Sequence, residues 1–150
     1  MKGYIMTDYT NEGDYLVDLS LEGGSGKAYV TSPAKIHTQK DGSVSVEIEW
    51  SSANYNYMKV FDKDYYPVNE SGNSVFMLYL DSLYEELPVT AETTAMSQPH
   101  MIDYTLHFDT SSVREVNAGH SYASLIICAA LAVIILAAVF LIRRHGNERK

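Results

Sequence analysis

Apolar and polar residues alternate with a period of two along much of the chain before residue 110. The alternation is clear over residues 14–21 and unbroken over residues 43–50. Because successive side chains of a β-strand point to opposite faces, each run predicts a strand with one buried face. In the second run Val44, Val46, Ile48 and Trp50 are expected to point inward. Similar runs predict strands at residues 28–31, 34–38, 55–61, 65–68, 74–80, 89–94 and 100–109.

Turn-forming residues separate these runs. Residues 22–26 read EGGSG, residues 40–42 read KDG and residues 71–73 read SGN. Such segments tolerate the positive φ angles that tight turns need. Residues 81–87 are expected to form a helical turn or a loop. This series of short strands in about a hundred residues predicts an all-β fold, an immunoglobulin-like antiparallel β-sandwich over residues 14–109.

A different pattern begins at residue 123. Residues 123–142 contain no charge and no proline, and twenty residues span roughly 30 Å as a helix. We expect this C-terminal transmembrane helix to follow a short polar stalk at residues 110–122. The basic tail, residues 143–150, indicates a cytoplasmic C-terminus and an extracellular domain in a single-pass membrane protein.

The N-terminal segment bears on this topology. An extracellular domain has to be exported, yet residues 1–13 contain no apolar run of signal-peptide length. We therefore interpret residues 1–13 as the remnant of a longer chain. The alternative is a tail-anchored protein with a cytoplasmic domain, which would carry four basic residues across the bilayer.

Charge and cysteine content exclude several classes of function. Before residue 122 there are eighteen acidic and seven basic residues, a net charge of −11, which argues against nucleic acid as a partner. Cys128 is the single cysteine, so no disulfide and no cysteine-ligated zinc or iron–sulfur cluster is available. Leu21 and Ala28 break the phosphate-loop pattern around EGGSGKA, and no catalytic motif is present. We expect no enzyme.

The segment with most candidate chemistry is residues 93–109. In a strand from His100, that residue shares one face with Ile102, Tyr104, Leu106 and Phe108, and Met96 joins this face if the strand begins earlier. An apolar surface that presents Met, His and Tyr can ligate haem iron and shelter a porphyrin. Spacing alone favours the plainer interpretation of a core tyrosine, a gap-filling methionine and an exposed edge histidine.

Four segments together resemble the NEAT (near iron transporter) family of surface domains in Gram-positive bacteria. They are YLVDLSL, EGGSGKAYVTSPAKI, DGSVSVEIEWSSANYNYMKV and PHMIDYTLHFD, within residues 14–109. The resemblance implies a β-sandwich that binds haem in a slit between its final hairpin and a lip after the first strand. The family's last strand carries Y-x-x-x-Y, whose first tyrosine ligates ferric iron and whose second hydrogen-bonds to it. His100 and Tyr104 stand at these positions, which implies a divergent member.

A more distant resemblance, to a NEAT-like haem protein that uses two methionines, implies Met96 as a ligand. Met58 would be the second only if its strand lies across the slit. Thioether and imidazole ligands are softer than phenolate, so Met96 and His100 are the expected iron ligands. The resemblance places Ser25 at the start of the lip, and Lys27 and Tyr29 over a porphyrin edge or a propionate.

The expected function is therefore that of a membrane-anchored extracellular domain that captures haem, or a related iron compound, and relays it toward an iron uptake transporter. The expected partners are haem or a haem-carrying protein, components of an iron ABC transporter, and membrane lipid. The alternative is an immunoglobulin-like module for adhesion or interaction that binds protein without haem.

Overall fold

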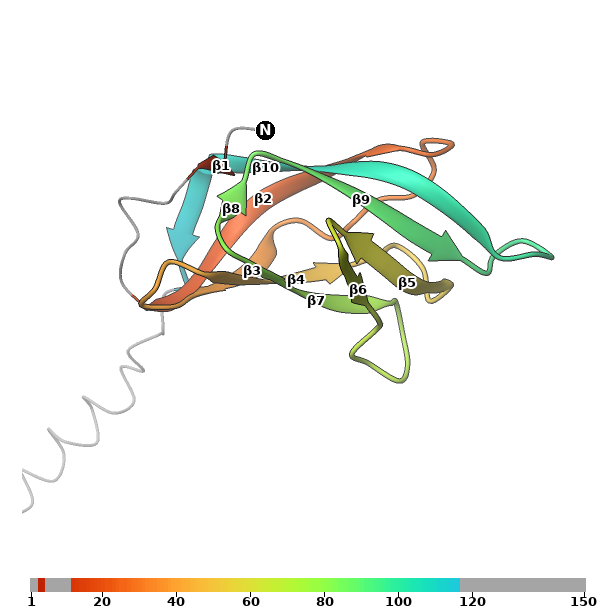
Figure 1. Ribbon diagram of the computed structural model, residues 1–150, viewed down its shortest axis with the longest axis horizontal. Coiled ribbons are helices and arrows are strands. Elements are labelled where there is room, and N and C mark those ends of the chain that lie inside the picture. The colour runs from red at the N-terminus through yellow and green to blue at the C-terminus, as the bar shows by residue number, and fades with distance from the viewer. Residues whose placement is uncertain (1–2, 5–11, 117–150) are drawn as a thin grey trace, which may run out of the picture. The chain divides into compact units, whose positions relative to one another are not determined.

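The computed structural model describes residues 12–116 and the backbone of residues 3–4 (Figure 1). The expected transmembrane helix and cytoplasmic tail lie outside these residues, as do residues 117–122 of the expected stalk. Within the described part, no helix is long and apolar enough to cross a membrane. The strands are β1 (Gly3–Tyr4), β2 (Gly13–Gly23), β3 (Ala34–Thr38), β4 (Val44–Glu49), β5 (Tyr55–Val60), β6 (Lys63–Tyr65), β7 (Val75–Leu80), β8 (Leu83–Tyr84), β9 (Glu86–Thr93) and β10 (His100–Glu115).

Eight of these strands form one antiparallel sheet in the order β6-β5-β9-β10-β2-β3-β4-β7, and β1 pairs separately with β8. The sheet curls so that its two outer strands meet. The Tyr65 hydroxyl in β6 donates a hydrogen bond to the Tyr79 carbonyl in β7 at 3.2 Å and accepts one from the Tyr79 N–H at 3.4 Å. The result is an all-β, barrel-like sandwich, which confirms the expected fold class for this part of the chain.

The inward faces predicted from the alternation are buried. Val44, Val46, Ile48 and Trp50 are each at most 2% exposed. The Trp50 indole stacks on the Tyr55 ring with centroids 4.0 Å apart, and its Nε1–H donates to the Met58 sulfur at 3.1 Å. These contacts hold Trp50, which follows β4, against two residues of β5 in the core.

Four local expectations were wrong. Residues 28–31 form only an isolated bridge, between Val30 and Trp50, because their pairing with the end of β4 is limited to the hydrogen bonds of Tyr29 and Thr31 on either side of it. The strand expected at residues 65–68 lies earlier, as β6. Residues 81–87 contribute β8 and the start of β9 instead of a helical turn or a loop.

The fourth concerns the last strand, which does not stop at residue 109. β10 continues to Glu115, through residues that we expected to begin the stalk, and Figure 1 shows that it bends sharply. A bulge between Asp109 and Arg114 shifts the register against β2, so the polar residues inside it do not alternate. Arg114 then pairs with Asp18 across the strands at 3.1 Å.

Replacing Met58 by leucine tests the Trp50 contact. Leucine conserves volume but accepts no hydrogen bond, so the buried indole N–H loses its partner and the free energy of unfolding should fall by about 1 to 3 kcal/mol. Met77→Leu is the matched control, because Met77 is only half-buried and should change stability by less than about 0.5 kcal/mol. Equal effects of the two variants in denaturant titrations would contradict this account.

Candidate functional site

The candidate residues gather at one end of the sandwich, which we call the loop end. It is built from the β2–β3 connection (24–33), the β4–β5 connection (50–54) and the β9–β10 tip (94–99), and Figure 1 shows it around the far tip of the β9–β10 hairpin. Backbone hydrogen bonds tie the three segments together. Ser51 N–H donates to the Tyr29 carbonyl at 2.9 Å, and Thr94 N–H donates to the Asn54 carbonyl at 2.8 Å.

Tyr104 lies beneath the glycine-rich turn that follows β2. Its ring is 5% exposed, and a Cβ built on Gly24 would lie 2.9 Å from the Tyr104 Cε1 atom. The φ angles of Gly23 and Gly24 are +118° and +58°, so glycine is needed both for the backbone and for the close approach. The turn therefore seals one face of the tyrosine ring.

The Tyr104 hydroxyl is hydrogen-bonded to the hydroxyl of Tyr55, with the oxygens 3.3 Å apart. Burial raises the pKa of the Tyr104 phenol, and the hydrogen bond to Tyr55 raises it further. Tyr104 is consequently a neutral phenol at physiological pH. The hydroxyl is buried and already has a partner in the fold, so this position suits a hydrogen-bonding role.

His100 is the histidine with free nitrogens among the three that the structure describes. His37 is 2.7 Å from the Asp14 carboxylate, and His107 is 2.9 Å from that of Glu22 and 3.7 Å from that of Glu86. His100 is the first residue of β10. Its ring is exposed and makes no hydrogen bond or ion pair with any described residue. Its imidazole is therefore available to an external ligand.

The two candidate methionines differ sharply in accessibility. Met96, in the hairpin tip, is 63% exposed, whereas Met58 is fully buried against Trp50. Met58 is thus a core residue, and the Trp50 indole already occupies its sulfur. This burial argues against Met58 as a second thioether ligand.

The lip residues are all on the surface of the loop end. Ser25 and Lys27 are exposed, and Tyr29 is 63% exposed. Lys27 forms no ion pair with a described residue. The structure therefore brings Ser25, Lys27, Tyr29, Met96, His100 and Tyr104 to one end of the fold and leaves out Met58.

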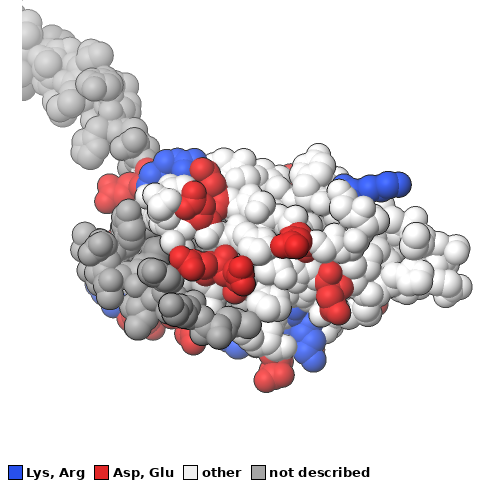
Figure 2. Space-filling model, turned by 90° about the horizontal axis from the view of Figure 1, so that it is seen from above, with Lys and Arg blue, Asp and Glu red and all other residues white. Residues whose placement is uncertain are grey.

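The loop end contains no carboxylate although the domain is acidic. Residues 23–40, 50–61 and 93–102 include the whole of its three connecting segments and contain no Asp or Glu. Figure 2 shows the same separation, with acidic side chains over the body of the molecule and a tip almost free of them. An anionic ligand would meet far less repulsion here than over the body.

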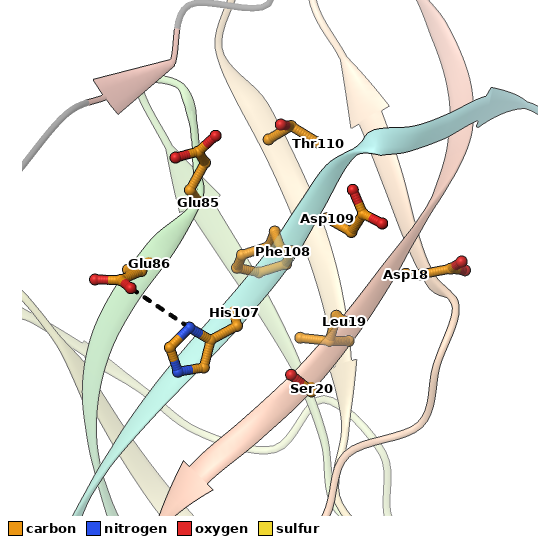
Figure 3. A pocket seen from close by; sticks show the side chains of 9 residues that line it. All are labelled: Asp18, Leu19, Ser20, Glu85, Glu86, His107, Phe108, Asp109 and Thr110. Carbon is orange, nitrogen blue, oxygen red and sulfur yellow. Dashed lines mark ion pairs between the residues drawn. The ribbon is translucent and has the colours of Figure 1, made fainter.

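A hollow elsewhere on the molecule has the opposite character. It encloses about 450 Å³ between β2, β9 and β10, and Asp18, Glu85, Glu86 and Asp109 line it (Figure 3). Its histidine, His107, is already paired with carboxylates on both nitrogens. This hollow disfavours an anionic ligand and offers no free imidazole to a metal.

Reasoning from sequence missed Tyr55 as the partner of Tyr104. The two tyrosines are 49 positions apart, on strands that flank β9 from either side, with Tyr55 opposite Thr93 and Tyr104 opposite Val89. Only the order of strands could have revealed the pair. The one available signal was the aromatic segment NYNYM itself.

Comparison with known proteins identifies this architecture. The structure is similar to the NEAT5 domain of IsdX2, a B. anthracis hemophore in complex with heme, with a TM-score of 0.52 at 17% identity over 66% of this chain and 97% of that one. The domain has the NEAT fold. A mutant of the same IsdX2 domain, also in complex with heme, gives a TM-score of 0.49 at 18% identity, covering 66% of this chain and 96% of that one. No family model matches the sequence, and no functionally curated protein does.

Replacing Gly24 by alanine tests how tightly the lip packs on Tyr104. The left-handed backbone should cost about 1 to 2 kcal/mol and the clash with the ring about 1 to 3 kcal/mol more. Gly26→Ala is the control, since Gly26 has a similar φ of +75° but no atom within 4 Å of the place that a Cβ would occupy. If thermal unfolding shows equal losses for both variants, the lip does not rest on Tyr104.

Proposed function

We propose that this domain is a divergent NEAT domain that binds haem at the loop end. The observation that carries the proposal is the coincidence of unpaired iron ligands with the absence of carboxylates. An exposed thioether, Met96, and a free imidazole, His100, lie on one hairpin of an otherwise acidic molecule. The NEAT domain whose fold it shares is itself a hemophore bound to heme.

The described residues fit a haem group in specific roles. His100 and Met96 are the candidate axial ligands, because neither side chain is engaged by the fold and both donor types bind haem iron. Lys27 offers an unpaired ammonium to a propionate, and the exposed Tyr29 ring offers an apolar edge to the porphyrin. When bound, haem supplies a transferable iron. The protein supplies ligation and a surface without competing negative charge.

Tyr104 takes a supporting role in this proposal. As a neutral phenol bonded to Tyr55 and packed under Gly24, it holds the lip and β10 at a fixed spacing. Replacement of the family's first tyrosine by His100 moves ligation from phenolate to imidazole or thioether. Such ligands favour ferrous iron more than phenolate does.

The proposal extends to cellular context. Residues 123–142 anchor the domain in the membrane of a Gram-positive cell with the domain outside, and the domain receives haem from a carrier and passes it to an iron ABC transporter. The apolar run and the basic residues after it support this orientation. The domain performs no catalysis in this account.

Adding haemin to the purified full chain in mild detergent should produce a saturable Soret band. His100→Ala and Met96→Ala should each shift the band or change the spin state, because an axial ligand acts directly on the iron. Tyr104→Phe should act more weakly. It should reduce the affinity for haemin by no more than about 10- to 100-fold, as is typical when a hydrogen-bonding group next to a metal ligand is removed. The measurement is absorption spectroscopy against a detergent blank.

His107→Ala is the matched control for these variants, since His107 lies on the same strand but in the acidic hollow and should leave the spectrum unchanged. A spectrum unaffected by the Met96 and His100 variants but abolished in Tyr104→Phe would make the phenol the ligand. A flat titration of the wild-type chain would remove haem binding and favour the protein-binding alternative.

The proposed topology predicts a protease-sensitive domain. When the chain is expressed behind a signal peptide, protease added to intact cells should digest the domain and spare an epitope placed after Lys150. The same protease added after lysis should remove the epitope too, which serves as the control. Protection of the domain in intact cells would support the tail-anchored orientation instead.

A further inference from the structure

A second pocket lies at the opposite end of β5 from the haem site. Tyr55 starts β5 beside the hairpin tip, whereas Phe61 follows its last residue in the two-residue turn that leads into β6. The pocket encloses about 410 Å³, and four aromatic side chains line it: Phe61, Tyr65, Tyr79 and Tyr84. Figure 1 shows the β5–β6 turn well away from the β9–β10 tip.

The rings are held in place by several contacts. The Phe61 and Tyr84 rings meet edge to face with centroids 5.5 Å apart, and the Tyr84 hydroxyl donates to the Asp81 carboxylate at 2.5 Å. The Tyr65 hydroxyl is fixed to the backbone of Tyr79. The aromatic walls are therefore ordered, although Phe61 and Tyr79 remain 49% and 58% exposed.

Phe61 occupies a backbone conformation that is unfavourable for phenylalanine. Its φ is +54°, and it is the one non-glycine residue with positive φ in the described chain. Asparagine or glycine is preferred at this position of a two-residue hairpin turn, because a bulky side chain is strained there. Such strain concentrates at functional sites. A phenylalanine at a position that favours asparagine or glycine therefore points to a role for its ring in the pocket.

The charges at the rim are mainly negative. Asp62 and Asp81 line the pocket together with a single cation, Lys63, which makes no ion pair with a described residue. Aromatic faces attract cations, and cages of several rings recognise quaternary ammonium groups. We propose that this pocket binds a small organic cation with an alkylated ammonium head. The site is independent of haem binding.

Choline and 3,3-dimethylbutan-1-ol are the probes, because they have nearly the same shape and only choline is charged. Calorimetric titration of the full chain should show saturable binding of choline and at least about tenfold weaker binding of the alcohol. Asp62→Asn should weaken choline binding and Lys63→Gln should strengthen it. Lys59→Gln, which removes a lysine outside this pocket, should have no effect.

Phe61→Asn separates folding from binding. Asparagine tolerates the left-handed turn, so the melting temperature should stay equal or rise while choline binding is lost. Equal affinity for choline and the alcohol, weaker binding in Lys63→Gln, or full binding in Phe61→Asn would each overturn the proposal. So would a lysine-rich peptide that binds through Phe61 when choline does not, since the ligand would then be a partner's side chain.

Discussion

The contact of Tyr104 with the glycine lip and with Tyr55 is the constraint on which the loop end depends. Three elements that are distant in sequence meet at this one ring: β10 carries it, the turn after β2 covers it, and β5 supplies its hydrogen-bond partner. Trp50 adds the β4–β5 connection by stacking on Tyr55 and packing edge-on to Tyr104 at 5.2 Å. The lip and the hairpin are thereby held beside each other.

Because of this constraint, two polar side chains of β10, those of Tyr104 and His100, have different roles. The same strand face carries Tyr104 into the core and leaves His100, four residues earlier, beyond the end of β2 and exposed. The Tyr104 side chain is fully engaged in packing and in its hydrogen bond to Tyr55. The His100 imidazole remains available to bind a ligand. The three connecting segments contain no acidic residue, so the loop end lacks the negative charge that the rest of the domain carries.

Much of the fold follows from local pattern. The bounds of β3 and the inward side chains of β4 were predicted correctly because period-two alternation reports directly which face is buried. Three features that were missed depend on pairings that alternation does not encode. The bulge hid the end of β10, the strand order hid the contact between Tyr55 and Tyr104, and the burial of Met58 depends on which side of β5 faces Trp50.

Haem binding at the loop end is tested most directly by locating bound haemin through NMR of the full chain labelled with nitrogen-15. Ferric iron broadens nearby amide signals, so a site at the loop end predicts losses confined to residues 24–33, 50–54 and 94–101, with signals of residues 61–65 and 79–86 retained. Broadening around the acidic hollow that contains His107, or no localised broadening at all, would contradict a haem site at the loop end.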